Sequence, residues 1–181
     1  MNPTDIRIET DRLLLRPPRI EDFDGFAELQ ADAEATRFIG GHVTRAEAWR
    51  RFLWQPGAWL VQGFGMFGVV EKSGQWVGQI GPWKPEGWPG NEIGYSFHPR
   101  AWGKGYATEA GIAAVDWAFE HLGWDDIIHC IDPGNEASQR VAQRLGSRKL
   151  RSGRLPSPFE DTAVDIWGQT REQWCARSAN A

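Results

Sequence analysis

A turn with two glycines, between a predicted strand and a predicted helix, is the segment of this chain that most clearly suggests chemistry. The strand ends at Phe97, the glycines are Gly103 and Gly105, and the helix begins near Ala107. Glycines let the backbone approach a ligand and direct successive N–H groups into one concavity, at the positive end of a helix dipole. Such a geometry favours a phosphate or pyrophosphate. The alternative is an ordinary tight connection between a strand and a helix.

Two common phosphate-binding motifs do not fit this turn. A P-loop requires Gly-x-x-x-x-Gly-Lys-Ser/Thr, but Lys104 is followed by Gly105, and position 98 is a histidine. A dinucleotide-binding fingerprint requires a third glycine where this chain has Thr108. A nucleotide-binding protein is therefore disfavoured.

The elements that must position this turn alternate between strand and helix patterns. Runs of β-branched and aromatic residues predict strands, and apolar residues at helical spacing predict helices. We expect strands within residues 6–15, 59–70, 76–80, 92–97, 127–131 and 164–169, with a hairpin formed by the second and third. We expect helices at 21–35, 107–122 and 136–145, and one that begins at Thr44, where Thr44 and Glu47 have capping-box spacing. Because no repeat or linker is visible, these elements predict one α+β or α/β domain.

The composition fits a globular protein of one domain. The 181 residues are 41% hydrophobic and 24% charged, which is enough apolar material for a core. The formal net charge of −4 argues against nucleic acid as the main partner. Cys130 and Cys175 supply neither a disulfide framework nor a metal-finger spacing, so no metal is expected. Because no apolar stretch approaches the roughly 20 residues that span a bilayer, we expect a cytoplasmic protein without a membrane partner.

Several segments together resemble the GCN5-related N-acetyltransferase (GNAT) superfamily, and within it the RimJ/RimL-type branch. The segment from Arg100 to Gly105 fits Arg/Gln-x-x-Gly-x-Gly/Ala, the acyl-CoA pyrophosphate signature of that superfamily. The other matching segments are the helix that opens with Asn135-Glu136-Ala137-Ser138 and ends at Leu145-Gly146, the opening Glu9 to Arg16, and the stretch Glu92 to Tyr95. The resemblance runs from about Ile6 to Gln169, which is nearly the whole chain.

The resemblance implies a GNAT fold, in which helices flank a mixed, mostly antiparallel sheet that is splayed between two parallel strands where acyl-CoA binds. The single domain would cover residues 1–170, with a polar C-terminal tail at 171–181. Acetyl-CoA would be the co-substrate, held by the strand that ends at Phe97 and by the N–H groups of the turn. The implied contacts are Phe97, His98, Arg100, Gly103, Lys104, Gly105, Tyr106, Ala107, Thr108 and Asn135, although Asn135 also suits a plain helix N-cap.

Formation of an amide from a thioester requires a base, because an alkylamine with a pKa of about 10.4 is mostly protonated at neutral pH. By resemblance this base is Glu92, at the start of the strand that leads into the turn. The alternative for Glu92 is a solvated strand-end carboxylate, and Asp165 on the last strand is the second candidate. His98 and His129 have suitable ordinary pKa values. We expect structural roles for both, because His98 precedes Pro99 and His129 lies in a buried apolar strand.

The acid that protonates the departing thiolate is where the chain departs from the family pattern. Many members have a tyrosine seven residues after the helix-opening asparagine, whereas this chain has Ala142. In the RimJ/RimL-type branch a serine at the position of Ser138 is thought to supply the proton, and by resemblance Ser138 takes this role. The alternative is a hydroxyl in the first helical turn. A backbone N–H near Tyr95 to Phe97 is the expected oxyanion donor. Ser147, where an aromatic residue usually follows Leu-Gly, is a second departure.

We therefore expect an acyl-CoA-dependent N-acetyltransferase, in which a primary amine of a small molecule or a protein N-terminus attacks the thioester directly in a ternary complex. The alternative is a non-catalytic acyl-CoA-binding or sensing module of the same fold. Eleven tryptophans mark the composition, and five fall where the resemblance puts the acceptor side: Trp49, Trp54, Trp59, Trp83 and Trp88. They could form a wall for a hydrophobic or cationic amine. Core or dimer contacts are the more usual role of such rings, so a homodimer is a candidate assembly.

Overall fold

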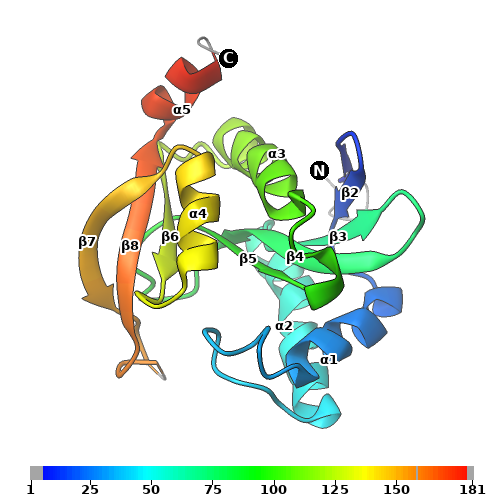
Figure 1. The fold of residues 1–181 in the computed structure, drawn as a ribbon. Coiled ribbons are helices and arrows are strands. Elements are labelled where there is room, and N and C mark those ends of the chain that lie inside the picture. Colours follow the sequence, from blue (N-terminus) through cyan, green and yellow to red (C-terminus); the bar gives the residue numbers. More distant parts are fainter. Residues whose placement is uncertain (1–5, 158, 179–181) are drawn as a thin grey trace. The chain divides into compact units, whose positions relative to one another are not determined.

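The computed structural model describes residues 6–157 and 159–178. Its strands are β1 (Ile8–Glu9), β2 (Leu13–Arg16), β3 (Phe67–Glu71), β4 (Trp76–Trp83), β5 (Glu92–Phe97), β6 (Asp126–Ile131), β7 (Arg148–Arg154) and β8 (Ala163–Thr170). Its helices are α1 (Phe23–Ala31), α2 (Arg45–Gln62), α3 (Tyr106–His121), α4 (Glu136–Arg144) and α5 (Arg171–Ser178). Strands and helices therefore mix along the chain, as the sequence pattern predicts (Figure 1).

The strands follow one another in an eight-stranded sheet of order β1-β2-β3-β4-β5-β6-β8-β7. The pairs β1–β2, β2–β3, β3–β4, β6–β8 and β7–β8 are antiparallel, whereas β5 and β6 are parallel. A parallel pair in a mostly antiparallel sheet is the arrangement that the resemblance implies. The expected fold class is therefore confirmed.

The parallel pair β5–β6 has a short ladder, whose register pair is Glu92 with Ile128. Beside it, the Ile128 amide donates to the Asn91 carbonyl (2.9 Å). Further along the two strands, hydrogen bonds from side chains replace the backbone ladder. The Cys130 amide donates to the Glu92 carboxylate (3.1 Å), and Nδ1 of His129 donates to the Ile93 carbonyl (2.7 Å). The residues that replace the ladder here include the predicted base.

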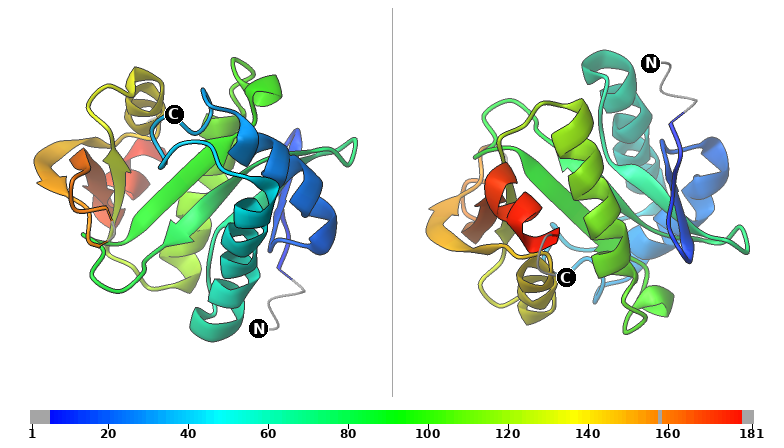
Figure 2. Two further views of the ribbon diagram at one scale, coloured as in Figure 1. Left: turned by 90° about the horizontal axis from the view of Figure 1, so that it is seen from below. Right: turned by 90° about the horizontal axis from the view of Figure 1, so that it is seen from above.

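The chain divides into two compact units, and strands β4 and β5 and helix α3 contribute residues to both. The first unit comprises residues 1–81 and 95–113, and the second comprises 82–94 and 114–181. In the first unit, helices α1 and α2 lie side by side (Figure 2). Phe26, Leu29, Phe52 and Trp76 form their buried core cluster. Phe26 and Leu29 stand three residues apart on α1, which is helical spacing, so this helix buries one face.

In the second unit, the faces of β6 and β8 bury different sets of residues. Ile131 and Trp167 pack with Ala142 of α4, so this helix covers one face (Figure 1). On the opposite face, Ile128 packs with Val164 and Ile166. Alternation of side chains along a strand produces this division. Glu92 and Cys130 share the face of Ile128, because Glu92 pairs with Ile128 and Cys130 lies two residues further along β6.

Helix α2 is longer than the sequence pattern predicts. Its start is as expected, since the Thr44 hydroxyl accepts from the Glu47 amide (3.3 Å) and the Glu47 carboxylate accepts from the Thr44 amide (3.2 Å). The segment that begins at Trp59, expected as a strand, is instead the last turn of the helix, and β3 begins only at Phe67. The buried Trp59 indole donates to the Met66 carbonyl (2.9 Å). Tertiary packing therefore overrides the strand-like composition.

Two elements near the C-terminus were not predicted. Strand β7 lies at the edge of the sheet and is mostly exposed and charged, so it lacks the apolar alternation that identifies a strand. Helix α5 forms within the segment expected as a polar tail. Its Trp174 is 3% exposed, and the indole donates to the Asp116 carboxylate (2.7 Å). Residues 179–181 of the expected tail lie outside the described residues.

Candidate active site

The turn between β5 and α3 holds both glycines in the left-handed region, where glycine is strongly favoured. The φ angle of Gly103 is +73° and that of Gly105 is +79°. A Cβ atom built on Gly103 would have no heavy atom within 4 Å, so its Cα faces open space. The Glu109 amide donates to the Gly105 carbonyl (3.1 Å), which starts the ladder of α3. The Thr108 amide also donates to the Gly105 carbonyl (3.2 Å), so the N–H groups that suit a phosphate are those before it, up to Ala107.

The end of strand β5, just before the turn, is fixed by hydrogen bonds to its backbone. The His98 amide donates to the Val77 carbonyl (2.9 Å), and the Trp102 indole donates to the Phe97 carbonyl (2.8 Å). The Ser96 hydroxyl is buried without a hydrogen-bond partner in the described part of the chain. Buried hydroxyls are usually paired. A ligand that pairs with this strand, as pantetheine would, fits that unpaired group.

Arg100 and His98 bond to each other and to helix α1. Nδ1 of His98 accepts from Nε of Arg100 (3.0 Å), and the Arg100 guanidinium forms an ion pair with Glu28. Burial lowers the pKa of His98, the Arg100 guanidinium lowers it further, and Glu28 opposes both effects. His98 is therefore neutral at physiological pH. Both residues stabilise the turn from within the first unit, and their contact with acetyl-CoA stays a prediction.

Glu92 lies at the start of β5 with its carboxylate enclosed by the second unit. The residue is 7% exposed. Oε1 accepts from the Cys130 amide (3.1 Å), and Oε2 accepts from the Trp88 indole N–H. Trp83 meets the Trp88 ring edge to face, with ring centroids 6.3 Å apart. The alternative of a solvated strand-end carboxylate is therefore wrong, because the group is buried among aromatic rings with two N–H donors.

Burial raises the pKa of Glu92 from its ordinary value of 4.5 to about 7, against the opposing effect of the N–H donors of Cys130 and Trp88. A carboxylate with a pKa near neutral pH can take a proton from an ammonium group and later release it. This environment gives Glu92 the proton affinity that a general base requires at neutral pH.

Three other titratable groups of the second unit, the candidates Asp165 and His129 and the neighbouring Cys130, are poorly suited to act as the base. Hydrogen bonds from Lys149 (2.7 Å) and Ser152 (2.8 Å) lower the pKa of Asp165. Burial lowers the pKa of His129 to about 4, although its bond to a backbone carbonyl opposes this. Burial raises the pKa of the Cys130 thiol, and the neighbouring Glu92 carboxylate raises it further. Asp165 therefore stays ionised, whereas His129 and Cys130 stay neutral at physiological pH.

Asn135 and Ser138 form the N-terminal cap of helix α4. Oδ1 of Asn135 accepts from the Ser138 amide (3.1 Å), and both residues are half-buried. The cap uses the oxygen of the Asn135 side chain, so its NH2 group is a donor for a ligand. The expected N-cap is confirmed. The acetyl-CoA contact of Asn135 and the proton-donor role of Ser138 stay predictions.

The five tryptophans expected on the acceptor side have different surroundings. Trp59 is 2% exposed and belongs to the core. Trp54 is 63% exposed on helix α2, and Trp49 stacks on a neighbouring phenylalanine of the same helix. Trp83 and Trp88 are half-buried, and Trp88 touches a candidate catalytic group. The five tryptophans therefore do not share one role, and only Trp83 and Trp88 lie next to the candidate base Glu92.

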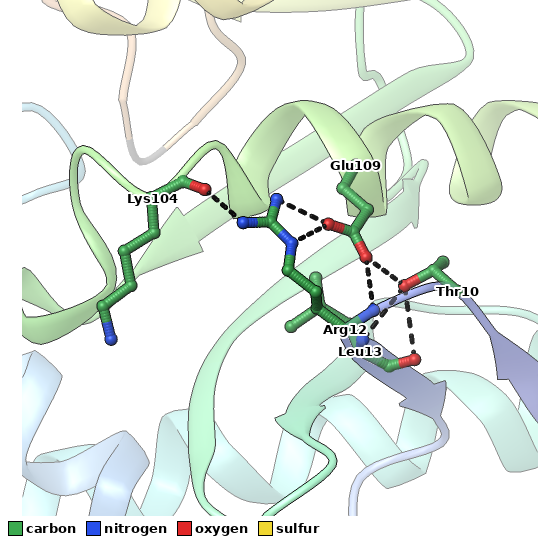
Figure 3. A network of polar contacts seen from close by, with 5 residues as sticks. All are labelled: Thr10, Arg12, Leu13, Lys104 and Glu109. Carbon is green, nitrogen blue, oxygen red and sulfur yellow. Dashed lines mark hydrogen bonds and ion pairs between the residues drawn. The ribbon is translucent and has the colours of Figure 1, made fainter.

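The partners of the turn and of the base could not be identified from the sequence. Figure 3 shows Arg12 between the Lys104 carbonyl and the Glu109 carboxylate, at the start of α3. Arg12 lies in the Glu9 to Arg16 segment of the family resemblance and Glu109 in the helix after the turn, 97 positions apart, and no linear pattern pairs them. Trp88 stands four residues before Glu92 in a loop, and only burial and the hydrogen bond reveal its role.

Within residues 6–157 and 159–178, no group of three His, Cys, Asp or Glu side chains is placed to hold a metal ion. In the same described ranges, no helix combines the length and the apolar character needed to cross a membrane.

Known proteins with related sequences and structures reveal the family. Residues 12–148 match the family described as acetyltransferase (GNAT) domain. The uncharacterized protein YkkB of Bacillus subtilis (strain 168) is 32% identical over 159 residues, which cover 83% of this chain and 91% of that one. The FsC-acetyl coenzyme A-N(2)-transacetylase of Aspergillus fumigatus is 29% identical over 181 residues, covering 92% and 77%. The crystal structure of the acetyltransferase from Agrobacterium tumefaciens str. C58 has a TM-score of 0.79 and 27% identity, covering 92% and 95%. The chain therefore belongs to the GNAT acetyltransferase family.

Proposed function

We propose that this protein is an acetyl-CoA-dependent N-acetyltransferase of the RimJ/RimL-type branch, acting on the primary amine of a small molecule or a protein N-terminus. The observation that carries the proposal is the buried Glu92 carboxylate, whose pKa of about 7 suits a base for an amine. The Glu9 to Arg16 segment supports the branch. The Aspergillus relative, whose name describes an acetyl-coenzyme A N(2)-transacetylase, supports an amine acceptor.

The residues of the turn fit the binding of acetyl-CoA, which brings the reactive thioester. The amides from Gly103 to Ala107 would hold the pyrophosphate, because both glycines have positive φ angles and the open space at Gly103 leaves room for a ligand. The backbone of β5 up to Phe97 would hold the pantetheine, and the unpaired Ser96 hydroxyl lies beside it. The Asn135 NH2 group would add a second donor to the pantetheine.

In the proposed reaction, Glu92 removes a proton from the acceptor ammonium, and the neutral amine then attacks the thioester carbon. The indole N–H of Trp88 and the amide of Cys130 hold the carboxylate while it carries negative charge. As the carbon–sulfur bond breaks, Ser138 donates its hydroxyl proton to the departing thiolate. It is reprotonated, through water, by the second proton that the attacking nitrogen loses on becoming an amide. A backbone N–H near Tyr95 to Phe97 would stabilise the tetrahedral oxyanion. The direct transfer requires no protein nucleophile.

The test is release of free thiol from acetyl-CoA with the purified full chain, across a panel of amines and of peptides with free N-termini. We expect turnover with one acceptor class, and the panel distinguishes a small-molecule amine from a peptide. In Glu92→Gln we expect kcat to fall about 100-fold or more, with unchanged affinity for acetyl-CoA. Glu86→Gln, an exposed carboxylate in the preceding loop, is the matched control.

Three outcomes would contradict the proposal. Unchanged turnover and pH profile in Glu92→Gln would remove Glu92 as the base. Binding of acetyl-CoA without turnover on any acceptor would favour an acyl-CoA sensor of the same fold. Binding of ATP or NAD in place of acetyl-CoA would exclude an acetyltransferase.

A further inference from the structure

We propose that Arg12 is a positioning residue for the pyrophosphate turn: it holds the Lys104 carbonyl and thereby directs the Gly105 amide toward the ligand. This inference rests on the proposed role of the turn in binding acetyl-CoA. It assigns a function to a residue of the N-terminal strands, far from the turn in sequence.

The guanidinium of Arg12 is oriented by Glu109 in the first turn of α3. Nε and Nη2 of Arg12 lie 2.7 and 2.6 Å from Oε2 of Glu109. Oε1 of Glu109 accepts from the Arg12 amide (2.9 Å) and from the Thr10 hydroxyl (2.6 Å), so the carboxylate is itself fixed (Figure 3). One side of the planar guanidinium is therefore used for orientation, and Nη1 is left to act elsewhere.

Nη1 of Arg12 donates to the Lys104 carbonyl (2.8 Å), which lies between the two glycines of the turn. Because a trans peptide is planar, its C=O and N–H groups point in opposite directions. With the Lys104 carbonyl bound to Arg12, the Gly105 amide must therefore point away from the guanidinium. This peptide precedes a glycine, whose backbone turns freely, and the bond to Arg12 opposes rotation of the peptide.

The surroundings of the bond indicate that it orders the turn. Nη2 of Arg12 would lie 3.5 Å from a Cβ on Gly105, so the guanidinium packs against that residue. The guanidinium carbon also stands 4.8 Å from the centre of the Tyr106 ring. The Arg12 side chain is 48% exposed, and exposed ion pairs contribute little to folding stability. We therefore expect loss of this network to lower the affinity for the ligand and to change the folding stability little.

An arginine is required because two acceptors must be bound at once in fixed directions. Its planar fork presents donors on separate edges, whereas a lysine ammonium is a point charge on a flexible chain. Lysine at position 12 would keep the positive charge near the turn but could not orient against Glu109 and hold the Lys104 carbonyl together. The Arg12→Lys variant therefore separates positioning from simple attraction of a phosphate.

The experiment measures the affinity for CoA by isothermal titration, and that for pantetheine, which lacks the pyrophosphate, by displacement titration. For the wild type we expect far tighter binding of CoA. In Arg12→Met we expect CoA affinity to fall about 10- to 100-fold, as for loss of an interaction with a charged group, with pantetheine affinity unchanged. Arg12→Lys should behave like Arg12→Met. Arg7→Met removes an exposed cation from the same N-terminal segment and should bind both ligands as the wild type does.

Each contrary result has a distinct meaning. If Arg12→Met keeps the wild-type preference for CoA, the positioning role is wrong while the turn stays a pyrophosphate site. If Arg12→Lys restores CoA affinity, charge and not the fork is what matters, and the proposal is wrong. If the wild type itself does not prefer CoA to pantetheine, the proposed function of the turn fails, and the role of Arg12 fails with it. Unchanged pantetheine affinity shows that a variant is folded.

Discussion

Replacement of Glu92 by glutamine is expected to raise the stability of the protein relative to the wild type as pH rises through 7, while it removes the proposed base. Glutamine has the shape of the protonated glutamate and carries no charge at any pH. The buried environment that raises the pKa of Glu92 also opposes its ionised form in the folded chain. The variant therefore removes an unfavourable buried charge, and the free energy of unfolding reports how large that effect is.

The sign and the size follow from the two pKa values of Glu92. The folded chain keeps the proton up to about pH 7, whereas the unfolded chain releases it near the ordinary value of 4.5. The stability contribution of Glu92 is therefore fully present below pH 4.5 and is lost as pH rises through 7. Each unit of difference between the two pKa values corresponds to about 1.36 kcal/mol. The free energy of unfolding therefore falls by about 3 kcal/mol in all, of which about 2 kcal/mol is lost between pH 5 and pH 7.

Urea unfolding of the wild type and of Glu92→Gln, at about pH 5, 6, 7 and 8, measures the difference in their free energies of unfolding. The side-chain amide that replaces the carboxylate can accept from the Cys130 amide, but its NH2 group opposes the Trp88 N–H. This mismatch adds a contribution that does not depend on pH. The predicted signal is therefore the change in the difference with pH. Glu86→Gln serves as the exposed-carboxylate control.

A difference between wild type and Glu92→Gln that stays the same from acid to alkaline pH would refute this reasoning. It would mean that Glu92 is ionised in the folded chain with an ordinary proton affinity. Such a carboxylate would also be a weaker base for an amine.

Three further changes test other parts of the structure. Gly103→Ala puts a methyl group into open space at a φ of +73°, so we expect weaker CoA binding by titration; wild-type affinity would contradict the pyrophosphate placement. Ser138→Ala keeps the amide that Asn135 caps, so kcat should fall in the thiol-release assay while CoA affinity stays unchanged; an undiminished kcat would remove Ser138 as the acid. Arg16→Met leaves the Asp22 carboxylate, whose residue is 2% exposed, without its guanidinium partner. Urea unfolding should show a loss of about 3–5 kcal/mol, and a loss below about 1 kcal/mol would contradict this view of the pair.

The turn and most of the elements could be predicted from the sequence because short-range interactions determine them. The family could be predicted from the motifs that these segments carry. The glycines at 103 and 105 form a turn between strand and helix, as predicted, and their positive φ angles are ones that glycine adopts readily. The Thr44 capping box and the Asn135 cap form as predicted, since each joins residues three positions apart. The alanine-rich helix after the turn likewise follows from local propensity and spacing.

Tertiary structure decided what lies between segments far apart in the chain. The last turn of α2 is helical because Trp59 is buried there, although its residues favour a strand. Glu92 could be named from the sequence, but its pKa depends on burial and on the donors Trp88 and Cys130. Arg12 meets Lys104 and Glu109 only once strand and helix have packed. Solvent exclusion and hydrogen-bond direction are properties of the folded arrangement, so a linear pattern does not contain them.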